Sequence, residues 1–394
     1  MTTDQLIQQE ESHQIPTYSK LPIVMERGEG AYVWDADGNR YLDFYGGHCV
    51  CLLGHSPPAV VEAVQEQAGK LVFYSNVAYS TVRAEASARL AEMAPDGMEQ
   101  VFFANSGSEA NETALKLARK HTGRSGVLAM EQGFHGRTLG SLALTYADKY
   151  RAPYRDVLPD TRFVPFGDAD AAARAFEEHG DHLAAVVLEP IQSIAGVQTA
   201  APSYFRALRT LCDKHGVQLI FDEVQTGVGR TGTFSISEQL GMKPDLISLA
   251  KSLGAGVPVS SVLVSDEIAA GVESGDQGST FGGGMLAMAA VKATLDTIRE
   301  NDLMARATSI FGTICAALGP HVRDVRGRGC LIGVELDRPA APVRDALLRE
   351  GVLTGTSGDP NTLRLMPPIN TPDEALDAFV DTFQEVLERN AQPA

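Results

Sequence analysis

Short apolar runs alternate with longer segments of helical spacing from about residue 100 onward. The clearest runs, rich in Val, Ile, Leu and Phe, are residues 101–104, 127–130, 184–188 and 219–221. Runs of this length bounded by turn residues are typical of buried strands, and the segments between them carry apolar residues at intervals typical of helices. Regular strand-helix alternation predicts a mainly parallel sheet covered by helices on both faces, and hence an α/β fold.

The two ends of the chain show other patterns. Residues 1–20 are polar and without periodicity, which predicts a loose arm, whereas residues 31–43 alternate like a strand, turn at Asp37-Gly38 and return as a second strand. After residue 285 we expect a long helix, a turn at 325–329 and strands at 331–336 and 363–368.

These patterns predict two domains. We expect residues 61–285 to form a large domain and residues 286–394 a small C-terminal one, with residues 1–60 forming an arm and a hairpin that join the small domain. A chain of 394 residues is long enough for such a division.

Composition narrows the possible functions. The net charge of −17 argues against nucleic acid and anionic membrane surfaces as partners. The five cysteines have no spacing typical of a zinc site or a disulfide framework, so no metal is expected. The apolar runs look too short to span a bilayer and no signal-peptide core stands at the N-terminus, which predicts a cytoplasmic protein.

Two strand ends carry residues with chemical potential. Asp222 and Glu223 follow the run at 219–221, and Lys251 follows an apolar run at 246–250. Taken singly, each pattern more often marks a solvated strand end or a loop. Together, a carboxylate and a lysine at the ligand-binding edge of a sheet are what a pyridoxal phosphate enzyme needs, because the lysine can bond to the cofactor aldehyde and the acid can hold the ring nitrogen.

The turn at Asn105–Glu109 is a candidate phosphate site. Ser106 and Glu109 have the spacing of a helix capping box, and Gly107 and Ser108 place backbone N–H groups at the start of the expected helix. A helix start at the ligand edge of the sheet favours anions. An ordinary capped helix explains the turn equally well.

Further candidates lie in connecting segments. Phe134 can stack on a planar ring, and Arg137 can grip a carboxylate or pair with a surface acid. His48 and His55 lie in a glycine-rich connection, where hydrogen bonding to the loop is the favoured role for His55. Residues 278–284 form a loop suited to close backbone approach.

With these parts in place, the chain resembles the class III, ornithine-type, pyridoxal phosphate-dependent aminotransferases of fold type I, and most of all their acetylornithine group. The likeness runs from about residue 25 to the C-terminus. It rests on ordered motifs at family-like spacing: NSGSEAN from Asn105, FHGRT from Phe134, VLEPIQ from Val187, FDEVQTGVGRTG from Phe221, AKSLG from Ala250, GSTFGG from Gly278 and residues 325–333.

The resemblance implies roles at the cofactor. Lys251 matches the Schiff-base lysine and Asp222 the partner of the pyridine nitrogen, with Val224 against the ring face and Gln225 near its phenolic oxygen. The remaining cofactor residues implied are Ser106, Gly107 and Ser108 for the phosphate, Phe134 for stacking, and Thr280, which in this family reaches the phosphate of the neighbouring subunit. A homodimer is therefore implied.

It also implies a reaction. An amino donor and 2-oxoglutarate are the expected substrates, with the δ-amino group of an N-acyl-L-ornithine transferred in arginine biosynthesis. Arg137 matches the arginine that binds the substrate α-carboxylate, and Ser279 a substrate contact. Ornithine, 4-aminobutyrate or carrier-linked lysine are alternative donors, and a non-catalytic pyridoxal phosphate binder or a nucleotide-binding protein are alternatives of another class.

Two departures from the family pattern bear on the donor. Where relatives usually carry Gly-Glu-Gly-Gly, residues 193–196 read Ser-Ile-Ala-Gly, so Ile194 replaces the glutamate that masks the arginine corresponding to Arg364. His48 stands where ornithine enzymes tend to have tyrosine and acetylornithine enzymes an apolar residue. Either another acid covers Arg364, or the site binds an acidic donor throughout, and an N-acylornithine with an acidic acyl group, such as succinylornithine, would suit the second case.

Overall fold

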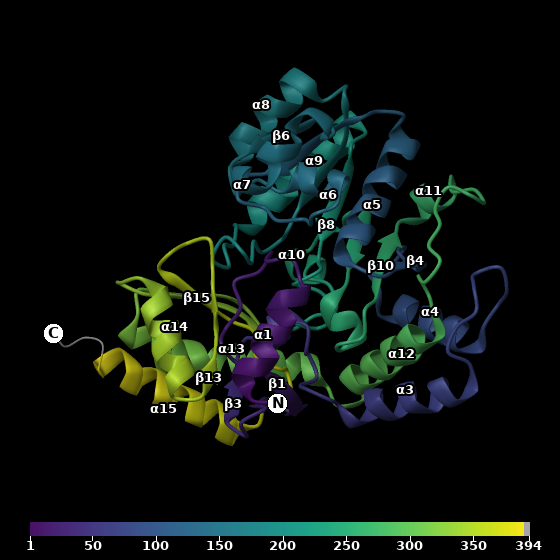
Figure 1. Cartoon of the computed structure of the whole chain (residues 1–394). Coiled ribbons are helices and arrows are strands. Elements are labelled where there is room, and N and C mark those ends of the chain that lie inside the picture. Colours follow the sequence, from purple (N-terminus) through teal and green to yellow (C-terminus); the bar gives the residue numbers. More distant parts are fainter. Residues whose placement is uncertain (390–394) are drawn as a thin grey trace.

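A seven-stranded sheet forms the centre of the structure, a computed structural model that describes residues 1–389 (Figure 1). The strand order is β4-β10-β9-β8-β7-β5-β6; strands pair in parallel from β9 to β6, and β10 is antiparallel to both of its neighbours. In this order the strands are Gln100–Ala104, Ser260–Val264, Leu246–Leu249, Gln218–Asp222, Leu183–Leu188, Gly126–Met130 and Thr161–Val164. The predicted mainly parallel sheet is confirmed.

Both faces of this sheet are buried. Along β7, Ala185 and Val187 join the cluster that contains Ala110 and Ala114 of α5, whereas Val186 and Leu188 join the main core on the other face. Alternate side chains of a strand point to opposite faces, so each strand reads as continuously apolar. The helices beside the sheet are α5 (Gly107–Thr122), α6 (Leu139–Leu144), α7 (Asp148–Arg151), η1 (Ala152–Val157), α8 (Ala169–His179), α9 (Pro202–His215), α10 (Ser237–Leu240), η2 (Lys251–Gly254) and α11 (Asp266–Ala269).

A helical layer lies beside the β4 edge of the sheet (Figure 1). Helix α12 (Met285–Glu300) packs against α3 (Pro58–Lys70) and α4 (Thr81–Met93) through its buried face, which includes Met288, Val291 and Leu295. The predicted long helix after residue 285 is thus present, and it joins this layer.

The N-terminal segments form a second sheet in the order β1-β2-β3-β13. The predicted hairpin is confirmed as β2 (Tyr32–Asp35) and β3 (Arg40–Asp43); β1 (Met25–Glu29) pairs with β2, and β13 (Val352–Leu353) runs parallel to β3. The hairpin therefore shares a sheet with a strand from the C-terminal third. A short α2 (Gly46–Cys49) follows.

The expectation of an unpatterned N-terminal arm was wrong. Residues Thr3–His13 form helix α1, because Thr2 accepts a hydrogen bond from the N–H of Gln5 and the Gln5 side chain accepts one from the N–H of Thr2. None of its side chains is buried, which explains why apolar periodicity gave no sign of it.

A third sheet lies in the C-terminal region, in the order β11-β12-β15-β14. Its strands are Asp324–Arg328, Leu331–Glu335, Thr362–Leu365 and Gly355–Thr356, and the helices around it are α13 (Leu303–Leu318), η3 (Gly319–His321), α14 (Ala340–Arg349) and α15 (Asp373–Arg389). The turn predicted at 325–329 is instead strand β11. Gly327 and Gly329 have positive φ, so they read as turn residues although Gly327 pairs with Ile332 across the ladder.

One segment is longer and more apolar than the sequence analysis allowed. By length and composition alone, Leu303–His321 could cross a membrane. In the structure one face of it packs against α12, α15 and β11, with Ile310, Ile314 and Leu318 in the core, and the rest of its surface stays at least partly accessible.

Candidate active site

A cavity of about 370 Å³ opens beyond the carboxyl ends of the central strands. The ligand edge of the sheet, the start of α5 and the start of η2 meet there. Most of the predicted cofactor residues line it, namely Ser106, Gly107, Ser108, Phe134, Asp222, Val224, Gln225 and Lys251. Segments more than 100 residues apart in the chain thus converge on one site.

Asp222 ends β8 with its carboxylate held on three sides. Its Oδ2 accepts a hydrogen bond from Asn111 Nδ2 at 2.8 Å and lies 2.8 Å from His135 Nδ1, and its Oδ1 accepts the N–H of Val224 at 3.1 Å. Burial opposes charge on His135, but the hydrogen bond and charge of Asp222 outweigh it and raise the pKa of His135. This favours a persistent buried ion pair.

Asn111 and His135 were missed in the sequence analysis. Asn111 lies one turn into α5 and also donates to the carbonyl of His135 at 2.8 Å, and both side chains are nearly inaccessible. Both residues fall within quoted motifs, but an asparagine on a helix and a histidine at a strand exit carry no signal of their own. Only the fold brings them to the carboxylate.

Lys251 begins η2 directly after β9. Its φ of 45° lies in the left-handed region, which a residue with a side chain adopts only when its surroundings hold it there. Burial lowers the pKa of Lys251, against the opposing influence of Cys49, Asp222 and Glu189. A lowered pKa makes the neutral, nucleophilic amine more accessible.

The start of α5 faces the same cavity. Ser106 caps the helix by accepting the N–H of Glu109 at 3.3 Å. The Glu109 carboxylate reaches the N–H of Asn105, one residue before the cap, so the predicted capping box is only half formed. A Cβ at Gly107 would lie 3.0 Å from both methyl groups of Val224, so glycine keeps Val224 against this helix end.

A second group of polar residues connects Gln225 of the cavity lining to the C-terminal sheet, although Ser193, Arg364 and His48 themselves lie outside that lining. The Ser193 hydroxyl donates to Gln225 Oε1 at 3.0 Å and accepts from Arg364 Nη1 at 3.3 Å. The other bonds of Arg364 go to the carbonyl of Thr356 at 2.8 Å and to the hydroxyl of Tyr45 at 3.4 Å. Arg364 is 4% exposed, and no carboxylate within residues 1–389 forms an ion pair with it.

His48 lies beside this arginine. Its Nδ1 hydrogen bonds the Tyr45 hydroxyl, and the two rings meet edge to face. Partial burial, together with the positive charges of Arg364 and Lys251, lowers the pKa of His48 to about 4, although the residue still reaches solvent. The ring is therefore neutral near pH 7. His55 has a structural role, but its Nε2 lies 2.8 Å from the carboxylate of Asp43 and does not bond the loop backbone as expected.

Phe134 is fixed by its backbone. Its N–H donates to Glu189 Oε1 at 2.9 Å, and burial raises the pKa of Glu189 to about 7. Arg137 is exposed and outside the cavity lining; its guanidinium lies 3.6 Å from the centre of the Tyr150 ring. In this conformation Arg137 stacks on an aromatic ring at the surface.

Ser279 and Thr280 also lie outside the cavity lining. Ser279 Oγ accepts from Asn105 Nδ2 at 3.2 Å and from the N–H of Gly282 at 3.0 Å, which places it just behind the α5 turn. Thr280 is exposed. Within this single chain the structure thus does not bring Thr280 to the site.

Comparison with known proteins identifies the family. The class-III aminotransferase profile matches residues 14–387. An acetylornithine aminotransferase of Methanopyrus kandleri is 44% identical over 96% of this chain and 97% of its own length. One from Listeria monocytogenes is 40% identical over 95% and 97% respectively.

Solved structures agree. The ornithine aminotransferase of Toxoplasma gondii superposes with a TM-score of 0.91 at 30% identity, over 99% of this chain and 96% of that one. The acetylornithine aminotransferase of Elizabethkingia anophelis gives 0.85 at 30% identity, over 99% and 100%. A second Toxoplasma gondii structure is described with pyridoxal phosphate at its active site. This chain therefore belongs to the class-III aminotransferases, the pyridoxal phosphate-dependent transaminases of fold type I.

Proposed function

We propose that this enzyme transfers the δ-amino group of an N-acyl-L-ornithine, acetylornithine first, to 2-oxoglutarate, giving the semialdehyde and glutamate in arginine biosynthesis. The single observation that carries the chemistry is the convergence of Lys251, Asp222 and the start of α5 on one cavity. The choice of donor is supported by relatives named acetylornithine aminotransferase. The archaeal and bacterial relatives of this name are 37–44% identical to this chain and match it over nearly their whole length.

The cavity fits pyridoxal phosphate. It offers an amine, a buried carboxylate and a helix start, the three groups that an aldehyde, a ring nitrogen and a phosphate require. Two buried polar atoms beside Asp222, Asn111 Oδ1 and His135 Nε2, have no partner within the described residues. Such atoms in a cavity wall are expected where a polar ligand belongs.

The residues that would hold the cofactor follow from their positions. Lys251 would bond its aldehyde, Asp222 its ring nitrogen, and Ser106, Gly107 and Ser108 its phosphate. Phe134 and Val224 would flank the ring, with Gln225 near its phenolic oxygen. When bound, the ring supplies an electron sink for negative charge that develops on the substrate carbon.

The protein's own residues contribute a group that transfers a proton and a negative charge held in a fixed position. With its pKa lowered by burial, the Lys251 amine can take up a proton at the substrate carbon and return it. Asp222 stays fixed by Asn111, His135 and the N–H of Val224, so its charge is in place before any substrate arrives.

Arg364 is the best-placed group for a substrate carboxylate, because its buried charge faces only neutral partners. Arg137, for which the sequence predicts the same role, would have to leave the Tyr150 ring to reach the cavity. We propose both as substrate ligands, together with Ser279 and His48.

Lys251→Ala tests the chemistry. The purified wild-type protein with added cofactor should absorb visible light, with a band that shifts on addition of donor, and the variant should lose donor-dependent turnover. Lys214→Ala, at an exposed position on α9, is the matched control. A Lys251→Ala variant that transaminates as well as its parent would refute the assignment.

A panel of donors with 2-oxoglutarate as acceptor tests the substrate. Within residues 1–389 no carboxylate pairs with Arg364, which favours succinylornithine as a second candidate donor, because an acidic acyl group could use that charge. Equal or better kcat/KM for acetylornithine would reject the succinyl preference and leave the main proposal standing. Turnover of free ornithine, 4-aminobutyrate or carrier-linked lysine alone would reject both.

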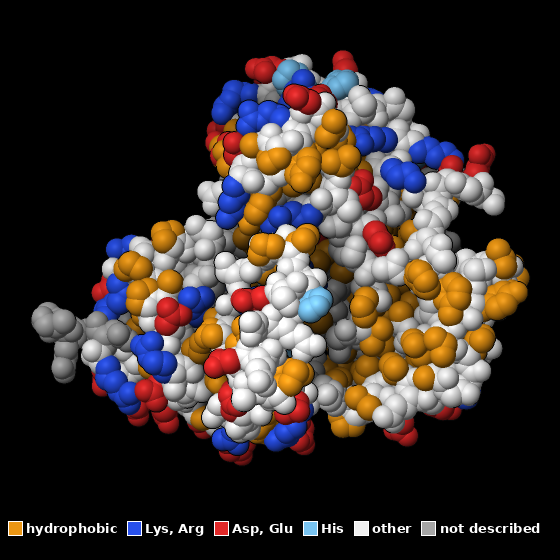
Figure 2. All heavy atoms as spheres, viewed as in Figure 1, with side chains coloured by type: hydrophobic (Ala, Val, Ile, Leu, Met, Phe, Trp, Pro, Cys, Tyr) orange, Lys and Arg blue, Asp and Glu red, His pale blue; other side chains and the backbone are white. Residues whose placement is uncertain are grey.

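We also propose a homodimer in which Thr280 completes the neighbouring site. Large apolar side chains are exposed near this loop, including Tyr79 and Phe281 at 107% and 64%. Figure 2 shows hydrophobic side chains gathered over the part of the molecule that contains α3, α4 and α12. Asn76 Nδ2 donates to the carbonyls of Ser279 and Gly282, which ties this apolar surface to the Thr280 loop. An apolar surface of this kind is typical of an obligate interface.

Two other expectations remain part of the proposal. We propose a cytoplasmic location. We also propose the division into an arm at 1–60, a large domain at 61–285 and a small domain at 286–394, of which residues 390–394 lie outside the described part. The sheet shared by β3 and β13 supports the joining of the arm to the small domain.

A further inference from the structure

Two arginines occupy one row of the C-terminal sheet in opposite electrostatic settings. Arg326 of β11 pairs with Gly333 of β12, and Gly333 pairs with Arg364 of β15. Arg364 has no carboxylate partner in the described chain, whereas Arg326 lies within 3.5 Å of three, at 2.6 Å from Glu335, 3.2 Å from Asp324 and 3.5 Å from Asp359. The charge of Arg364 is therefore left for a ligand, whereas the charge of Arg326 is neutralised by the three carboxylates.

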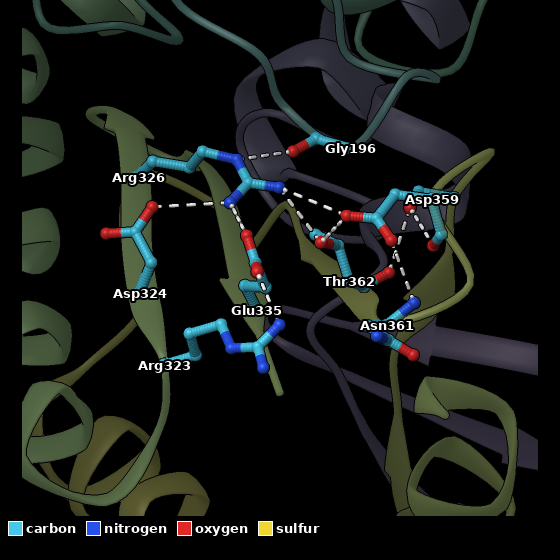
Figure 3. Close-up of polar contacts among 9 residues, drawn as sticks. Gly196, Arg323, Asp324, Arg326, Glu335, Asp359, Asn361 and Thr362 are labelled. Carbon is cyan, nitrogen blue, oxygen red and sulfur yellow. Dashed lines mark hydrogen bonds and ion pairs between the residues drawn. The ribbon is translucent and has the colours of Figure 1, made fainter. Parts of the chain in front are cut away.

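The remaining N–H donors of Arg326 bond groups in two different parts of the fold (Figure 3). Its Nε donates to the carbonyl of Gly196 at 2.9 Å, and its Nη2 donates to Thr362 Oγ1 at 2.9 Å. Gly196 belongs to the loop after β7 of the central sheet, and Thr362 is two residues before Arg364 on β15. The side chain therefore fastens this loop to the strand that carries Arg364.

The loop is closely fitted to the C-terminal sheet. A Cβ at Gly333 would lie 2.9 Å from Val197 Cβ, and one at Gly196, whose φ is +104°, would lie 3.1 Å from Asp359 Cβ. The N–H of Gly358 donates to the carbonyl of Ile194 at 2.6 Å. Glycines at these points allow backbone and sheet to touch, and Arg326 supplies the directional bond.

The same loop carries Ser193, which links the site to Arg364. Its hydroxyl bonds both Gln225 and Arg364, so a shift of the loop would move a partner of each. We infer that Arg326 is a positioning residue: by clamping residues 193–197 onto the C-terminal sheet, it sets Ser193 and thereby the carboxylate site at Arg364. This rests on the proposed role of Arg364 as a substrate ligand.

Arg326→Lys is the sharpest test, because lysine keeps the charge but cannot bridge Gly196, Glu335 and Thr362 in fixed geometry. We expect KM for 2-oxoglutarate and the Kd of glutarate, a non-reactive dicarboxylate, to rise by about tenfold with a smaller change in kcat. Glutarate binding is measured by calorimetry on the cofactor-loaded enzyme, independently of turnover. Gly196→Ala keeps the arginine, but its added Cβ would lie 3.1 Å from Asp359 Cβ and 3.3 Å from Arg326 Nη2 at a φ of +104°, so it should displace the loop and have the same effect.

Arg323→Gln is the matched control. Arg323 shares Glu335 at 3.5 Å but is largely exposed and, within the described residues, does not bond the loop, so its loss should leave both constants within about twofold, as for most surface substitutions. Equal losses in Arg323→Gln, or unchanged constants in folded Arg326→Lys and Gly196→Ala, would overturn the inference. A failed donor panel would reject the proposed function, whereas the glutarate Kd would still report on the clamp.

Discussion

At the scale of single residues, Asp43 shows how one carboxylate can shape a loop. It accepts the N–H groups of Tyr45, Gly46 and Gly47 at 2.9 Å each, and His55 Nε2 lies 2.8 Å away. Although burial opposes it, the bond to Asp43, with help from Cys51, raises the pKa of His55 to about 10. The imidazolium thus holds the turn that presents Tyr45 to the active site.

This raised pKa predicts a pH-dependent loss of stability. The contribution of the pair is fully present below the unfolded pKa of His55, about 6.5, and is lost as pH rises toward about 10. The Tm difference between wild type and His55→Asn should therefore shrink from pH 6 to pH 10. His321→Asn, an exposed control, should show no such trend; a constant difference for His55→Asn would contradict the ion pair.

Candidate catalytic residues that directly follow an apolar run could be predicted from the sequence. Asp222 and Lys251 stand where apolar runs stop, and the structure brings both to the cavity. Asn111 and His135 could not be recognised, because their role exists only once α5 and the segment after β5 meet β8. Of the three hydrogen-bond partners of Asp222, the N–H of Val224 is local, but Asn111 and His135 are brought there by tertiary contacts that no local pattern encodes.

At the scale of elements, the junction of α5 with the Asp222 strand controls the floor of the site. Gly107 has a helical backbone, so alanine costs nothing in φ and ψ there. Its Cβ would meet Val224 Cγ1 and Cγ2 at 3.0 Å. Because Val224 lines the cavity, a displacement of this side chain would change the shape of the cavity.

Gly107→Ala should accordingly weaken cofactor binding by about tenfold while leaving the Tm of the cofactor-free protein nearly unchanged. Titration of pyridoxal phosphate, followed by visible absorbance, measures the first effect and calorimetry the second. Gly69→Ala in α3, where nothing lies within 4 Å of the added carbon, serves as control. Unaltered cofactor affinity in Gly107→Ala would show that Val224 can yield without cost.

The type of an element was predictable wherever its buried positions follow one regular spacing along the chain. Five strands of the central sheet and the β2–β3 hairpin could be predicted because their side chains are buried continuously or in regular alternation, whereas β6 (Thr161–Val164) and β10 (Ser260–Val264) were not predicted. Strand β11 was hidden by its glycines, and α1 by the absence of any buried face. Where tertiary contacts or capping bonds decide the element, periodicity cannot reveal it.

At the scale of the whole molecule, the exposed apolar surface around Tyr79 and Phe281 is the main feature that one chain leaves unpaired. It adjoins the loop of Thr280, a residue that lies outside the chain's own cavity lining. A second copy placed on this surface would cover it and could receive Thr280.

Mixing two inactive variants tests this arrangement. If Thr280 serves the neighbouring site, a hybrid dimer of Thr280→Val and Lys251→Ala subunits contains one intact site. Random reassortment should then restore about a quarter of wild-type activity. Each variant alone should remain inactive or nearly so, and sedimentation should show dimers. Full activity of Thr280→Val, or no recovery on mixing, would exclude a shared site.

The anchoring of Asp222 by Asn111 and His135 bears on how this enzyme unfolds. Its three members belong to β8, α5 and the segment after β5, so local opening of any one of them exposes the ring-nitrogen site. Loss of the visible absorbance of the bound vitamin on warming would then report local unfolding before the global unfolding transition.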